Sequence, residues 1–122
     1  MSETITLPWP PSVNTYWRTP RSGKLAGMTM LSVKAREYRK AAVEAIGQRL
    51  PITSRTAVSI LLCAPTRRSY DLDNHVKAIL DALTHAHFWL DDSQVDRLTV
   101  VRGFPGKPGS ALVKIEEMSD AK

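Results

Sequence analysis

The chain has 122 residues, and its 17 Lys and Arg outnumber its 12 Asp and Glu, so the formal net charge is +5 at pH 7. This length leaves room for one hydrophobic core, so we expect residues 1–122 to form a single domain, and the 43% of hydrophobic residues argues against a disordered protein. The single cysteine, Cys63, excludes an intrachain disulfide, and no apolar run is long enough for a signal segment or a membrane span, so we expect a cytoplasmic protein.

The N-terminal half predicts a strand, a basic loop and a helix. Ile5 and Leu7 alternate with threonines, which is typical of a short strand, and the prolines that follow end it. Residues 19–27 are rich in glycine and basic side chains and are expected to form a mobile loop. Ser32 is suited to cap a helix that runs to about Leu50. The predicted buried stripe of this helix consists of Ala35, Tyr38, Ala42, Ala45, Ile46 and Leu50.

The C-terminal half predicts a central strand, a second helix and a hairpin. Residues 57–64 are the most apolar run, which indicates a central strand. An amphipathic helix is expected from about Asn74 to His85. Residues 95–104 and 111–116 are strand-like, and a frayed tail is expected after Met118. These elements predict an α+β fold with one mixed β-sheet and two main helices packed on it.

The distribution of acidic residues is the most informative feature. Half of them fall in one short window of a basic chain: Asp71, Asp73, Asp81, Asp91, Asp92 and Asp96. A carboxylate cluster weakens binding to a polyanion unless a divalent cation fills it. If the segment before the second helix is extended, the side chains of Asp71 and Asp73 point to the same side. Asp92 follows the helix, so the segment from Phe88 onward has to carry it back to join them.

Such a cluster has the chemistry of a magnesium site for phosphodiester hydrolysis. Mg²⁺ prefers hard oxygen ligands, and two or three carboxylates with a phosphate oxygen and water satisfy it. The metal would polarise the phosphate and activate a water molecule. Lys77, four residues after Asp73, would stabilise charge that develops at phosphorus. Three histidines are weaker candidates for carrying protons: His75, His85 and His87.

Each of these residues also has a structural explanation that the spacing leaves open. Asp73 could be a helix N-cap, and Asp91 and Asp92 could be solvated turn residues. Lys77 could pair with Asp73 or with Asp81 along the helix. Arg67 and Arg68 could be a solvated pair in a loop or could contact phosphates. The aromatic side chains of Trp9, Tyr16 and Trp17 could pack in the core or a loop, or could stack on bases.

Three motifs follow one another and together cover almost the whole chain. They are L-P-W-P-P-S at 7–12 with Asn14, Tyr16 and Arg18 after it, R-R-S-Y-D-L-D-N at 67–74 with Lys77 after it, and F-W-L-D-D-S-Q-V at 88–95. They resemble the motifs of the RusA family of Holliday-junction resolvases, in which the second is a D-x-D-N-x-x-K segment. Ser69 and Tyr70 depart from the pattern, because relatives can have further arginines at these positions. The strength of junction binding therefore does not follow from the resemblance.

The resemblance implies a homodimeric, Mg²⁺-dependent endodeoxyribonuclease. Such an enzyme cuts two opposed strands of a four-way DNA junction symmetrically in recombination and repair, and it is often encoded by a prophage. By motif position, Asp71, Asp73 and Asp92 are the catalytic and metal-binding carboxylates and Lys77 is the catalytic lysine, while a role of Asp91 as a further ligand stays open. The expected DNA contacts are Arg18, Arg21, Lys24, Arg67, Arg68 and Asn74.

Two other classes of protein are compatible with the residues alone. A non-catalytic, basic DNA-binding or architectural protein would keep the positive charge and make the acidic cluster incidental. A structural or protein-interaction domain would use the positive charge for solubility only. Product analysis after a magnesium titration separates the nuclease from the first alternative, and DNA binding at low salt separates it from the second.

Overall fold

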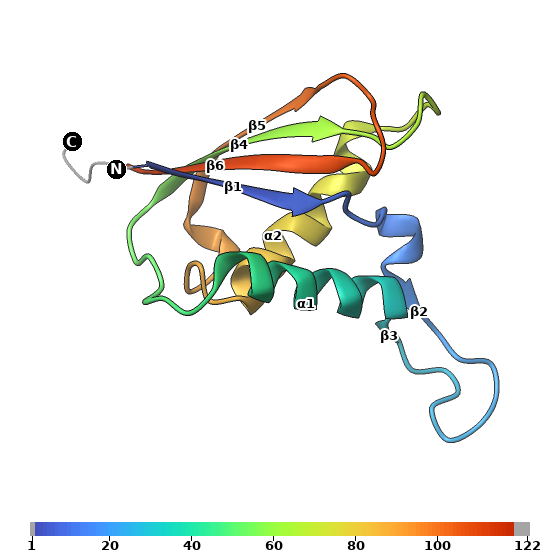
Figure 1. Ribbon diagram of the computed structural model, residues 1–122. Coiled ribbons are helices and arrows are strands. Elements are labelled where there is room, and N and C mark those ends of the chain that lie inside the picture. The colour runs from blue at the N-terminus through green and yellow to red at the C-terminus, as the bar shows by residue number, and fades with distance from the viewer. Residues whose placement is uncertain (1, 119–122) are drawn as a thin grey trace.

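The computed structural model describes residues 2–118, which form a mixed sheet with two helices on one of its faces (Figure 1). The strand order is β1-β6-β4-β5, with β4 and β5 parallel and β6 antiparallel to both β1 and β4. The predicted α+β fold with two main helices is therefore confirmed. The expected tail beyond Met118 lies outside the described residues. The bounds are β1 Ser2–Pro8, α1 Val33–Ile46, β4 Thr56–Cys63, α2 Val76–His85, β5 Val95–Arg102 and β6 Ser110–Glu117.

The first helix begins as predicted and ends earlier than predicted. The Ser32 hydroxyl accepts a hydrogen bond from the Ala35 N–H at 3.1 Å, which caps α1. Gly47 then adopts a φ of 72° directly after the last helical residue, a conformation that glycine takes without steric cost. The expected end near Leu50 is therefore wrong, and so is the expected burial of Ala45 and Leu50, because Leu50 is 88% exposed and Ala45 is exposed too.

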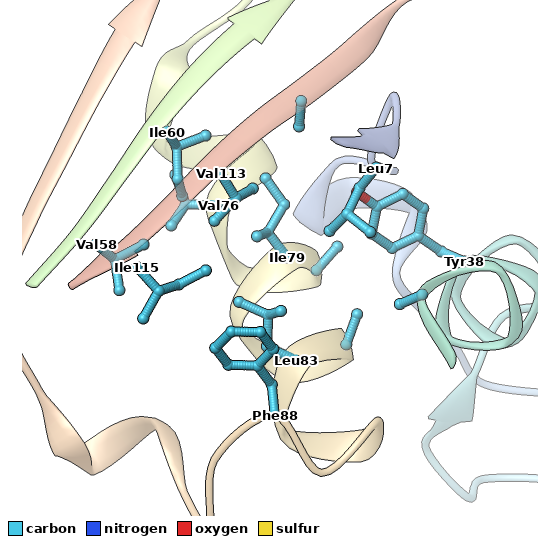
Figure 2. Close-up of a cluster of buried hydrophobic side chains, with 14 of the residues drawn as sticks. Leu7, Tyr38, Val58, Ile60, Val76, Ile79, Leu83, Phe88, Val113 and Ile115 are labelled. Atoms are coloured by element: carbon cyan, nitrogen blue, oxygen red, sulfur yellow. The ribbon is translucent and has the colours of Figure 1, made fainter. Parts of the chain in front are cut away.

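The second helix is preceded by a tighter turn. Residues Leu72–His75 form a 3-10 turn, η2, which leads directly into α2. The apolar face of α2 packs under β4 and β6, and Figure 2 shows Ile79 and Leu83 beside side chains of both strands. None of the helices within residues 2–118 is long and apolar enough to cross a bilayer.

The predicted basic loop stands on a small ribbon. The strands β2 (Trp17–Arg18) and β3 (Met30–Leu31) pair antiparallel, and the residues between them project from the body of the molecule (Figure 1). Almost all of residues 19–29 are exposed. The sequence predicted the loop but not this two-stranded stem, because two residues per strand leave no recognisable alternation.

Candidate active site

Asp71 and Asp73 lie where the chain leaves β4 and enters the helical layer. Asp71 is the N-cap residue of η2 and is extended, with φ −94° and ψ 134°, but its side chain makes no capping hydrogen bond. Asp73 already belongs to the 3-10 turn, so it is not the N-cap, and the segment between the two is not extended as expected. Both side chains are exposed, and neither has a hydrogen-bond or ion-pair partner among residues 2–118.

The N-terminal motif packs against this segment. The two together line an open groove with a volume of about 850 Å³, and its polar lining includes Asn14, Arg68, Asp71 and Asn74. Trp9 lies against the buried His75, with ring centroids 4.7 Å apart. The first and second motifs are thus parts of one site.

His75 links the groove to the N-terminal motif. Its Nδ1 lies 3.0 Å from the carbonyl oxygen of Pro10. Because a backbone carbonyl only accepts hydrogen bonds, Nδ1 carries the proton and donates it. This bond and the ring contacts with Trp9 and Tyr70 tie η2 to the N-terminal motif.

Lys77 lies on the first turn of α2, and its ion pair identifies its structural partner. Its ammonium is 3.4 Å from the carboxylate of Asp81, one helical turn further on. Tyr16 donates a hydrogen bond to the same carboxylate at 2.8 Å. Burial of Tyr16, together with this carboxylate, raises the pKa of its hydroxyl to about 12. Asp81 is therefore held in place from two sides and directs Lys77 along the helix surface.

Asp91 and Asp92 have different surroundings although they are adjacent. The Asp91 carboxylate accepts a hydrogen bond from the Ser93 N–H at 3.0 Å and caps the 3-10 turn η3 (Asp92–Gln94). Hydrogen bonding to Ser93 holds the pKa of Asp91 below its ordinary value. The turn alternative is therefore correct for Asp91. Asp92 has no side-chain partner in the part of the chain that the structure describes, so its carboxylate is available to a ligand.

Gln94 fixes this turn and was missed as a functional residue. Its side-chain oxygen accepts hydrogen bonds from the N–H groups of Leu90 and Asp91 at 2.9 and 3.0 Å. Its amide nitrogen donates to the carbonyls of Ile52 and Ser54, both at 2.9 Å. The spacing Asp-x-x-Gln, which is typical of a capping box, was the signal in the sequence that points to it.

Asp92 lies at the opposite end of the sheet from Asp71 and Asp73. The start of β5 pairs with the start of β4, at Val95 and Thr56, whereas Asp71 follows the end of β4. A strand of this length spans about 26 Å. The expectation that the segment from Phe88 carries Asp92 back to the pair is therefore wrong within one chain. The physical reason is the parallel crossover, in which α2 returns the chain to the beginning of the next strand.

The metal-ligating side chains of the described residues show the same separation. Within residues 2–118, no three His, Cys, Asp or Glu side chains are close enough together to hold a metal ion. One chain therefore offers Asp71 and Asp73 as a pair of free carboxylates and offers Asp92 at a distance from them. The roles predicted for these side chains remain predictions.

The candidate DNA contacts fall on two segments at the same end of the molecule as Asp71 (Figure 1). Arg67 and Arg68 are exposed on the loop between β4 and η2, and Arg68 and the half-buried Asn74 line the groove. The exposed Arg18 lies on β2. The ribbon loop beyond it carries Arg21 and Lys24, both exposed.

The chain is similar to known proteins over most of its length. Residues 8–116 match the family model described as endodeoxyribonuclease RusA. The chain is 42% identical over 123 residues to the crossover junction endodeoxyribonuclease RusA of Escherichia coli K12, with 95% of each chain covered. It is 39% identical over 115 residues to the corresponding protein of enterobacteria phage HK97, with 92% of each covered, and 41% identical over 123 residues to that of phage 82.

Proposed function

The chain belongs to the RusA family of endodeoxyribonucleases, and from this premise we propose that it resolves four-way DNA junctions by symmetric, Mg²⁺-dependent hydrolysis of two opposed strands. The observation that carries the proposal is the pair of carboxylates without structural partners, Asp71 and Asp73, beside a groove built from two family motifs. Recombination and repair, in a cell or a prophage, are the processes in which such junctions arise.

The residues present fit a magnesium ion. Mg²⁺ is usually held by one or two carboxylates together with phosphate oxygens and water. Asp71 and Asp73 are exposed oxygen donors that no hydrogen bond within residues 2–118 occupies. Asp92 is assigned the third carboxylate place by its motif position, although it lies apart from this pair within one chain. When bound, the ion supplies polarisation of the scissile phosphate and activation of a water molecule.

Lys77 and the basic side chains account for the rest of the chemistry. The ammonium of Lys77, which Asp81 and Tyr16 hold in direction, stabilises negative charge on the phosphate as the bond breaks. Arg67 and Arg68 contact phosphates beside the cut, and Asn74 lies next to them in the groove. The ribbon with Arg18, Arg21 and Lys24 extends the positive surface along a second arm of the junction (Figure 1).

Two equal cuts on a roughly two-fold substrate are made most simply by two identical active sites. A homodimer with a two-fold axis provides them. We therefore include a homodimer in the proposed function.

The substitution Asp73→Asn tests this assignment. We expect cleavage of a synthetic four-way junction to fall by at least about 10²-fold, because a ligand is lost at the point where charge develops. Junction binding should stay equal or become tighter, because one negative charge facing the phosphates is removed. Gel assays of product and of bound junction measure the two effects.

Glu44→Gln is the matched control, because it removes an exposed carboxylate from the middle of α1. It should leave both cleavage and binding unchanged. Normal cleavage by the Asp73→Asn protein would show that the metal assignment is wrong. A wild-type protein that binds the junction and leaves it uncut would instead be a non-catalytic DNA-binding protein.

A further inference from the structure

Phe104 is the most exposed of the large hydrophobic side chains within residues 2–118. It lies two residues after the end of β5, and it is 94% exposed. Single exposed apolar side chains are common at protein surfaces, so the surroundings of Phe104 decide what its exposure means.

The backbone on both sides of Phe104 is fixed to the end of β4. Before it, the N–H of Gly103 donates to the carbonyl of Leu62 at 2.7 Å. After it, the N–H of Gly106 donates to the carbonyl of Ala64 at 2.8 Å. The ring is therefore presented to solvent from a loop that is anchored at two points.

The Phe104 ring forms one wall of a hollow that adjoins the groove. This hollow has a volume of about 560 Å³, and its other walls include Arg67, Tyr70 and Arg102. Tyr70 lines the groove as well, so the two depressions share a wall. Because Asp71 follows Tyr70 directly, the hollow lies next to the proposed site of cleavage.

The hollow has the charge that a phosphate group requires. Three arginines line it, Arg67, Arg68 and Arg102, and none of its lining residues in the described part of the chain is acidic. The guanidinium of Arg102 lies 4.2 Å from the centre of the Tyr70 ring, and this cation–π contact orients it. The hollow can therefore attract DNA without a metal ion, in contrast to the groove with its carboxylate.

Arginines beside an exposed aromatic ring can recognise both parts of a nucleotide. A guanidinium pairs with the phosphate, and the ring stacks on the face of a base. Inside a linear duplex every base pair is stacked on both sides, so no face is free. At the branch point of an open four-way junction, the last base pair of each arm lacks a neighbour on one side. That free face is a part of the proposed substrate that a phenylalanine ring can cover.

We propose that Phe104 stacks on a base pair at the branch point of the junction, while Arg102 holds a phosphate of the same arm. The inference rests on the proposed function for its substrate and names a side chain that distinguishes junction from duplex. The positive surface attracts the phosphates of both forms of DNA. The stacking contact is made with the junction alone, and it requires neither the carboxylates nor the metal ion.

The substitution Phe104→Ala tests the stacking contact by binding alone. A labelled four-way junction and a linear duplex of the same sequence are titrated in EDTA at several salt concentrations. The dissociation constant of the junction should rise about 5- to 100-fold, because one base loses an aromatic partner. That of the duplex should not change. The salt dependence of junction binding should also stay the same, because no charge is removed.

Three further variants separate the ring from other effects. Leu50→Ala is the matched control, because Leu50 is 88% exposed and lies before the start of β4, at the other end of the sheet. It should leave both dissociation constants unchanged. Phe104→Tyr keeps the ring and should keep the wild-type affinities. Arg102→Gln should reduce the slope of log K against log salt for the junction by about 0.9, because one phosphate contact is lost.

The outcomes separate this inference from the proposed function. Equal changes for junction and duplex in Phe104→Ala, or no change, would overturn the stacking contact, and cutting by the wild-type protein would still support the nuclease. A wild-type protein that never cuts with Mg²⁺, but whose junction affinity depends on the Phe104 ring, would overturn the nuclease and support the stacking contact. A lower mass of Phe104→Ala in solution, with unchanged DNA affinities, would assign the ring to a protein contact and overturn the inference.

Discussion

At the scale of single residues, the carboxylates proposed to act in catalysis have no partner within the described fold. Other acidic side chains of the chain have partners: Glu3 pairs with Arg49, Asp81 with Lys77, Asp91 with the Ser93 N–H and Asp96 with Arg55. Asp71, Asp73 and Asp92 have none within residues 2–118. Free carboxylates on a positive surface oppose DNA binding, and the proposed Mg²⁺ ion would remove this repulsion.

Gln94 offers a test of how the Asp92 turn is held. Gln94→Ala removes four hydrogen bonds and leaves two carbonyls without their donor. We expect the free energy of unfolding to fall by about 2–4 kcal/mol, because buried polar groups lose partners. Urea denaturation followed by circular dichroism measures the change.

The exposed Gln48 provides the comparison for this test. Gln48→Ala should change the unfolding free energy by less than about 0.5 kcal/mol. Equal stabilities of the two variants would show that the Gln94 bonds do not hold the turn. Gln94→Ala should also reduce cleavage, because Asp92 is the first residue of the turn that Gln94 holds.

The choice between Asp91 and Asp92 shows the limit of prediction from single residues. Asp91 and Asp92 are adjacent acidic residues, so in the sequence only their positions within the family motif distinguish them. In the fold they differ because the Asp91 side chain bonds to the Ser93 N–H, two residues ahead. That bond depends on the backbone angles of a three-residue turn, which the spacing of residues does not determine.

At the scale of elements, the turn between β5 and β6 supports the loop that leads to Asp71. Gly109 in this turn has a φ of 84°. A Cβ atom there would lie 2.8 Å from Pro65 Cδ and 3.0 Å from Trp9 Cβ. The turn, the end of β4 and the N-terminal motif therefore meet without space for a side chain.

Gly109→Ala should therefore lower the free energy of unfolding more than Gly23→Ala does. Both glycines have positive φ, 84° and 85°, so both variants carry the same backbone strain of about 1 kcal/mol. Only Gly109→Ala adds a steric clash, since nothing lies within 4 Å of a Cβ at Gly23. We expect an additional loss of at least about 1 kcal/mol in thermal or urea unfolding. Equal losses would contradict the close packing of this turn.

The sequence predicted the elements better than their arrangement. Periodicity identified the strands and the two helices, because each buries one face against the core. It did not determine that β4 and β5 are parallel, since direction depends on the crossover through α2 and not on the pattern within either strand. This direction is what separates Asp92 from Asp71 within one chain.

At the scale of the whole molecule, the basic segments lie at the same end as Asp71 and Asp73. The groove with Asp71, the loop with Arg67 and Arg68, and the basic ribbon lie at the carboxyl end of β4 (Figure 1). A homodimer, as proposed, would place two such ends symmetrically about its two-fold axis. This arrangement suits a substrate that is itself roughly two-fold.

The central claim is that this chain is a Mg²⁺-dependent junction nuclease, and cleavage of an end-labelled four-way junction by the wild-type protein tests it most directly. With Mg²⁺, we predict paired nicks at symmetric positions in two opposed strands. The same mixture with EDTA, and a linear duplex of the same sequence with Mg²⁺, should stay intact. A junction that is bound but uncut at every Mg²⁺ concentration, or one that is cut equally well in EDTA, would contradict the account.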